Sequence, residues 1–131
     1  MDVSKTFSEM VKIMADALKP LIVFYERQKV AETLPKEYIN HKRLRCVIDC
    51  TEFFIQKPSD LLNQAATWAD YKHHNTLKCL VVICPQWSIC FISELFGGRT
   101  SDRHVVTHTR FLDHIVPGDQ VLADRGFQLK E

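Results

Sequence analysis

This 131-residue sequence lacks several features of proteins that are secreted, span a membrane or contain a structural zinc site. No C-x-x-C pair is present, so the cysteines do not have the ligand spacing of known zinc knuckles. The N-terminal stretch MDVSKTFSEM has no apolar signal core. The most apolar stretch, 77–92, is interrupted by Lys78 and Pro85 and falls short of the roughly 20 residues that span a bilayer. We therefore expect neither a secretory signal nor a membrane segment.

A strong net charge is also missing. The formal net charge is only +1, so any binding to nucleic acid must use local basic patches. The cysteines are five, an odd number, and four of them lie in apolar runs that resemble strands. This pattern indicates reduced core thiols of an intracellular protein. A zinc site that combines cysteines with His73 or His74 stays open as the weaker alternative.

The apolar pattern predicts a mixed α/β fold preceded by N-terminal helices. Apolar residues three and four apart predict helix from residue 5 to about 32, with a break or kink at Pro20. A second helical stretch, 21–34, should end near Pro35. Further helices are expected over 60–68, where Ser59 is the expected N-cap, and over 101–115.

Four strands are expected, and their order sets the topology. They cover 45–56, 76–84, 88–96 and 121–124, and a hairpin turn at 85–87 separates the second from the third. Three antiparallel strands followed by a helix and a fourth strand predict the sheet order 3-2-1-4. The fourth strand then lies parallel to the first, as crossover connections favour.

Two aspartates stand at notable places in these strands. Asp49 interrupts the apolar run RCVIDCTEFFI, and Asp124 ends the fourth strand. A carboxylate in an apolar place costs several kcal/mol unless a partner compensates its charge. On adjacent strands the two carboxylates would repel each other, and a hard divalent cation such as Mg²⁺ would remove that repulsion. Two such ions can support phosphodiester cleavage.

Structural explanations of the same residues also remain open. The carboxylates could pair with arginines, and Arg45, Arg99 and Arg125 are available. Asp124 could simply open a turn. The residues alone do not separate these explanations from a metal site.

Longer motifs add a resemblance that covers most of residues 41–128. The motifs IDCTE, YKHHNTLK, GGRTSDRH and LADRGF together resemble the DDE superfamily of transposase-derived endonucleases, and most closely its Harbinger-like group. The resemblance implies an RNase H-like fold, Mg²⁺ or Mn²⁺ as cofactor, DNA as partner and a nuclear location. It divides the chain into a helical N-terminal segment, 1–40, and a partial nuclease domain, 41–131.

The resemblance also implies roles for individual acids. Asp49 and Asp124 match the first two of three acids that hold two divalent ions. The third, a Glu on a later helix, has no counterpart before the last residue, so we expect an incomplete sheet and no DNA cleavage by this chain alone. Asp102 matches another acid of the pattern and is a second-rank metal ligand, although its expected place at a helix N-terminus, where the macrodipole favours an anion, is the preferred explanation. Glu52 should lie on the face opposite Asp49 and pair with a basic neighbour.

Two functions follow as hypotheses. The first is a metal-dependent DNA endonuclease domain of transposase origin; the alternative is an inactive, domesticated or truncated remnant that binds protein or DNA. An incomplete sheet edge would favour self-association in either case. Six basic residues near the motifs are natural contacts for DNA phosphates: Lys72, His73, His74, Arg99, Arg103 and Arg125. The alternative is that they are solvated side chains or salt partners of the acids.

Overall fold

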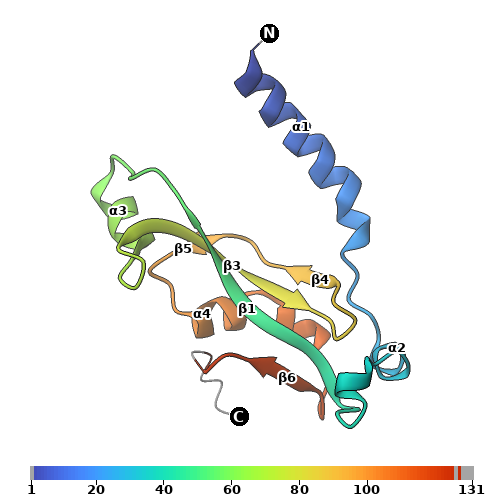
Figure 1. The fold of residues 1–131 in the computed structure, drawn as a ribbon. Coiled ribbons are helices and arrows are strands. Elements are labelled where there is room, and N and C mark those ends of the chain that lie inside the picture. The colour runs from blue at the N-terminus through green and yellow to red at the C-terminus, as the bar shows by residue number, and fades with distance from the viewer. Residues whose placement is uncertain (1, 126, 128–131) are drawn as a thin grey trace.

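The computed structural model describes residues 2–125 and 127, in which a mixed sheet of six strands is joined to short helices (Figure 1). The mixed α/β class is therefore confirmed. The α-helices are α1 (Val3–Leu18), α2 (Arg27–Glu32), α3 (Leu61–Thr67) and α4 (Asp102–His108), and the 3₁₀ turns are η1 (Lys19–Leu21), η2 (Lys36–Tyr38) and η3 (Arg110–His114). The strands are β1 (Leu44–Phe54), β2 (Trp68–Ala69), β3 (His74–Ile83), β4 (Ile89–Ile92), β5 (Phe96–Gly97) and β6 (Gln120–Ala123).

The sheet is built around the antiparallel pair of β1 and β3. β4 adds to β3 in antiparallel fashion, and β6 adds to β1 in parallel fashion, which gives the order β4-β3-β1-β6. The predicted 3-2-1-4 order and the parallel fourth strand are thus confirmed. The short strands β2 and β5 pair with the first half of β3.

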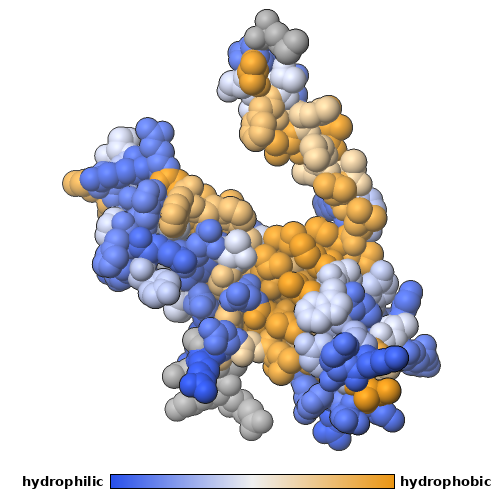
Figure 2. Space-filling view, in the orientation of Figure 1, coloured by the Kyte–Doolittle hydropathy of each residue, from blue (hydrophilic) through white to orange (hydrophobic). Residues whose placement is uncertain are grey.

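One face of the sheet carries the core. Alternate residues of β1 and β3, among them Ile48 and Leu80, pack against α4 and η3, where Val105, Val106 and Phe111 are completely buried or nearly so. The opposite face stays open within the described residues, and Figure 2 shows apolar side chains gathered over the middle of it. Partly or largely exposed apolar residues on this face include Val47, Val81, Ile83, Ile89, Ile92 and Leu122.

Helix α1 extends away from the sheet (Figure 1). Its first turn is capped by Asp2, whose carboxylate accepts a hydrogen bond of 3.3 Å from the Lys5 N–H. None of its residues is buried, and apolar side chains such as Phe7, Met10 and Met14 are more than half exposed. Within the described residues, no helix is long and apolar enough to cross a membrane.

The second helical stretch is much shorter than predicted. Residues 22–26 lack helical structure and α2 begins only at Arg27. The reason is Phe24, whose ring stacks on His114 with centroids 4.7 Å apart and lies 6.3 Å from the Phe111 ring. Packing of this ring against η3 outweighs the local helix propensity.

Two other predicted elements are interrupted by polar side chains that bond to the backbone. The third strand breaks after Ile92, because the Ser93 hydroxyl accepts from the Leu80 N–H at 2.9 Å and donates to the Glu94 carbonyl at 2.7 Å. The helix expected over 101–115 breaks at Thr109, whose hydroxyl donates to the Val106 carbonyl at 3.2 Å. This break turns Phe111 into the core.

The helix α3 also begins one residue later than its predicted cap implies. Asp60, not Ser59, is the N-cap, and its carboxylate accepts from the Asn63 N–H at 2.9 Å. Aspartate and serine are comparable as N-cap residues, so the choice between neighbours depends on backbone geometry.

A buried ion cluster joins the N-terminal region to the turn before β6. The Asp119 carboxylate is fully buried and lies 3.3 Å from Arg27 Nε and 3.4 Å from Arg45 Nε. Arg45 Nε makes no aligned hydrogen bond, so this contact is mainly electrostatic, and the Arg45 guanidinium also lies over the Phe24 ring at 4.9 Å. Arg27 donates to the carbonyls of Pro117 and Gly118. The cluster fixes the turn that leads into β6.

Replacement of Asp119 by alanine should destabilise the fold by about 3–5 kcal/mol, because Arg45 would stay buried without its counter-charge. The free energy of unfolding from urea titration measures this. The matched control is Asp113→Ala, which removes an exposed pair with Arg110 and should cost less than about 1 kcal/mol. Equal costs for both variants would contradict the structural role of the cluster.

Candidate metal and nucleic-acid site

Asp49 lies within β1, and Asp124 directly follows β6, the parallel neighbour of β1. Val47 of β1 lies opposite Leu122 of β6, and two residues further along each chain comes an aspartate. Residues two apart on a strand share a face, so Asp49 projects on the open face with Val47. Continuation of the β6 register by one residue would bring Asp124 to the same face. Neighbouring strands lie about 4.8 Å apart, which brings the two side chains to adjacent backbone positions.

The two carboxylates have the same local hydrogen bond. Asp49 Oδ1 accepts from the backbone N–H of Cys50 at 2.8 Å, and Asp124 Oδ1 accepts from that of Arg125 at 2.6 Å. Both side chains are exposed, and within the described residues each second oxygen is free of protein hydrogen bonds. Each aspartate therefore keeps one carboxylate oxygen available for a ligand.

The arginines that could have neutralised these acids lie elsewhere or have no carboxylate partner. Arg45 faces Asp119, and no ion pair of Asp49 or Asp124 exists in the part of the chain that the structure describes. The salt-bridge explanation of the two aspartates thus finds no support in the geometry.

The sequence model of the DDE superfamily endonucleases matches residues 48–131 of this chain. The chain belongs to this endonuclease family. The matched region begins one residue before Asp49 and includes Asp124. No curated protein and no solved structure matched the chain.

Asp102 of this endonuclease-family chain lies on the other side of the sheet, in the first turn of α4 after the N-cap Ser101. Its carboxylate accepts from Lys78 Nζ at 2.8 Å. The same ammonium lies 3.7 Å from the Glu52 carboxylate, which also accepts from the Thr76 hydroxyl at 2.8 Å. Asp102 thus lies at a helix N-terminus, as the structural explanation expects, and Glu52 has its expected basic partner in Lys78. A role of Asp102 as a metal ligand stays a prediction.

Lys78 was not singled out from the sequence, although a signal exists. Period-two alternation places it on the core face of β3 with Leu80 and Val82, and only 7% of the residue is exposed. A buried lysine needs carboxylate partners. Its position between Glu52 and Asp102 follows from that need.

The six candidate phosphate contacts do not form one cluster around the two aspartates. Arg125 adjoins Asp124, and Arg99 and Arg103 flank the start of α4. The others are Lys72 and His73 in the turn between β2 and β3, and His74 at the first position of β3. There, Lys72 lies 5.2 Å from the Tyr71 ring and His74 stacks on Phe54 at 4.7 Å. Their contacts with DNA remain a prediction.

All five cysteines are free thiols, and four of them are buried. This agrees with the predicted reduced core thiols. Within residues 2–125 and 127, no group of three or more His, Cys, Asp or Glu side chains is placed to hold a metal ion, so the zinc alternative finds no site there. Burial raises the pKa of Cys46 and Cys90 to about 12, and burial with the neighbouring Asp102 charge does the same to the pKa of Cys50.

These thiols make the fold sensitive to alkaline pH. The folded pKa values lie above the ordinary value of 9.0, so their contribution to stability is fully present below about pH 9 and is lost as pH rises toward 12. We expect the midpoint of urea unfolding to be lower at about pH 10.5 than at about pH 8.5, two values that bracket the onset of thiol ionisation. Cys46→Ala should flatten this decrease, whatever its effect on stability at neutral pH. A parallel decrease in the variant would contradict the assignment.

Proposed function

We propose that Asp49 and Asp124 together hold a divalent cation, Mg²⁺ or Mn²⁺, for hydrolysis of phosphodiester bonds in DNA. The observation that supports the proposal is the parallel register of β1 and β6, in which Val47 lies opposite Leu122, two residues before an aspartate in each segment. Family membership supports a nuclease-related domain with DNA as substrate.

The donor set fits such an ion. Two exposed carboxylates without a protein counter-ion repel each other, and hard cations favour carboxylate oxygens completed by waters and phosphate oxygens. When bound, a divalent cation supplies activation of water and stabilisation of the leaving oxygen. The chain itself contributes the two carboxylates, oriented by the N–H groups of Cys50 and Arg125.

The finer features implied by the resemblance belong to the same proposal. They are an RNase H-like domain at 41–131 preceded by the helical segment 1–40, action on nuclear DNA, and phosphate contacts through the basic residues named above. Self-association is part of it as well, because in the described structure β6 pairs only with β1 and leaves one edge open.

A second function, an inactive remnant that binds DNA or protein, is favoured by one observation. Within the described residues, no group of three or more His, Cys, Asp or Glu side chains is placed to hold a metal ion. Two carboxylates would fix an ion loosely, and phosphoryl displacement depends on precise positions. Metal binding separates a functional pair of acids from a remnant.

Mn²⁺ titration by calorimetry should detect weak binding, with a dissociation constant on the order of millimolar for a site with few charged ligands. Asp49→Asn and Asp124→Asn should each abolish it, because either change removes half of the carboxylate charge. The control Asp16→Asn alters an exposed acid of α1 and should leave binding unchanged. Undiminished binding in both site variants would reject the metal site.

A plasmid-nicking assay with Mn²⁺ tests the chemistry. We expect little nicking by the 131-residue chain, since two carboxylates alone hold the ions poorly. Robust nicking that is lost in Asp49→Asn and Asp124→Asn would contradict this expectation and show that the chain supplies a third ligand. Asp102→Asn would then be the first variant to examine.

A further inference from the structure

Arg99 is held in a fixed place by the two glycines before it. A Cβ on Gly97 would overlap the carbonyl oxygen of Ala66 in α3, and a Cβ on Gly98 would overlap the hydroxyl of Thr76. Only glycine allows this close approach of the chain to α3 and β3. The Arg99 N–H then reaches the Ala66 carbonyl at 3.3 Å.

The residue after Arg99 is fixed from the opposite side. The Thr100 carbonyl accepts from the buried ammonium of Lys78 at 2.9 Å, and that ammonium is itself held by Asp102. Arg99 thus lies between two anchored neighbours, although its own side chain is exposed. Within the described residues its guanidinium makes no ion pair.

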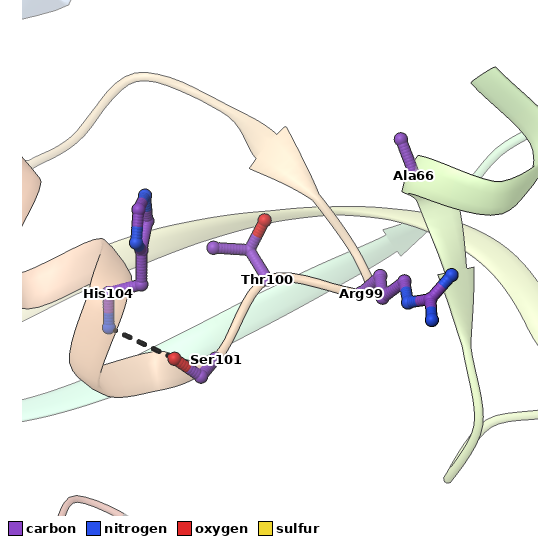
Figure 3. A pocket seen from close by; sticks show the side chains of 5 residues that line it. All are labelled: Ala66, Arg99, Thr100, Ser101 and His104. Carbon is purple, nitrogen blue, oxygen red and sulfur yellow. Dashed lines mark hydrogen bonds between the residues drawn. The ribbon is translucent and has the colours of Figure 1, made fainter. Parts of the chain in front are cut away.

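Two hollows meet at Arg99. One is lined by Arg99, Thr100, Ser101 and His104 beside α4, and the other by Arg99, Lys57, Gln64 and Trp68 beside α3. No carboxylate lines either hollow. Figure 3 shows the Arg99 side chain pointing away from His104, toward the side of α3. The guanidinium is therefore directed to the hollow that also contains an ammonium and an indole.

We propose that Arg99, Lys57 and Trp68 form a subsite for an unpaired nucleotide of a DNA strand, an inference that rests on the proposed function. Two cationic side chains without neighbouring acids suit a phosphate. Trp68 is 39% exposed at the wall of the same hollow and offers a surface on which a base can stack. A paired base inside a duplex has no free face to stack on the indole, so the subsite selects a single-stranded or unpaired position.

The test is a fluorescence titration with a short single-stranded DNA oligonucleotide of mixed sequence, in EDTA and at low salt. It uses Trp87→Phe as the parent protein, so that Trp68 is the remaining tryptophan. Binding should quench Trp68, and the duplex of the same sequence should bind more weakly and quench less. Arg99→Ala should weaken binding and lower the salt slope by about one. Trp68→Leu, followed by anisotropy of a labelled strand, should weaken binding about fivefold or more.

The control Arg110→Ala removes an exposed positive charge outside both hollows and should leave affinity for the strand unchanged. Wild-type affinity in Arg99→Ala, with the fold verified by circular dichroism, would overturn the subsite. Quenching by poly-glutamate at equal affinity would overturn the nucleotide assignment in favour of an acidic peptide. Equal quenching by duplex and single strand would overturn the selection of an unpaired base.

Failure of this inference is distinguishable from failure of the proposed function. The strand titration in EDTA does not depend on a divalent ion, whereas the Mn²⁺ titration depends on one, so the two measurements test the two proposals separately. A chain that binds Mn²⁺ through the two aspartates but shows no effect of Arg99→Ala would keep the metal site and lose the nucleotide subsite. The reverse pattern would keep the subsite and lose the metal site.

Discussion

The parallel hydrogen bonding of β1 with β6 creates the proposed site, because it joins two segments that are far apart in the sequence. The register is the essential detail: a shift of one residue would move Asp124 to the other face of the sheet, away from Asp49. The buried Asp119 cluster fixes the turn immediately before β6 and thereby supports that register. The proposed site thus depends on an electrostatic contact at the start of the strand.

The two faces of the sheet have separate tasks. The core face packs on α4 and places Lys78 between Glu52 and Asp102, where one ammonium contacts both carboxylates. Asp49 on the open face and Asp124 directly after β6 have no such partner within the described residues. Acids that are neutralised internally hold the fold together, whereas acids left facing solvent are available to bind a cation.

The sequence predicted the class of fold and the strand order, because apolar runs and crossover rules determine these features. It did not predict where helices and strands are interrupted. The break at Phe24 depends on tertiary packing, and the break at Ser93 depends on a hydrogen bond to the distant Leu80 backbone. The break at Thr109 accompanies a local bond of its hydroxyl to the Val106 carbonyl. The buried cluster around Asp119 was likewise missed, since PGDQ reads locally as an ordinary turn. The alternation of β3 could have revealed Lys78 as a buried charge.

The most direct test of the metal site is to locate a bound paramagnetic ion by NMR. Mn²⁺ added in small amounts to the isotope-labelled protein broadens the NMR signals of nearby amides. The account predicts that amides beside Asp49 and Asp124, including those of Cys50 and Arg125, broaden first, and that Asp49→Asn abolishes the effect at both strands together. Broadening centred on Asp102 and Glu52, or spread evenly over exposed acids, would contradict it.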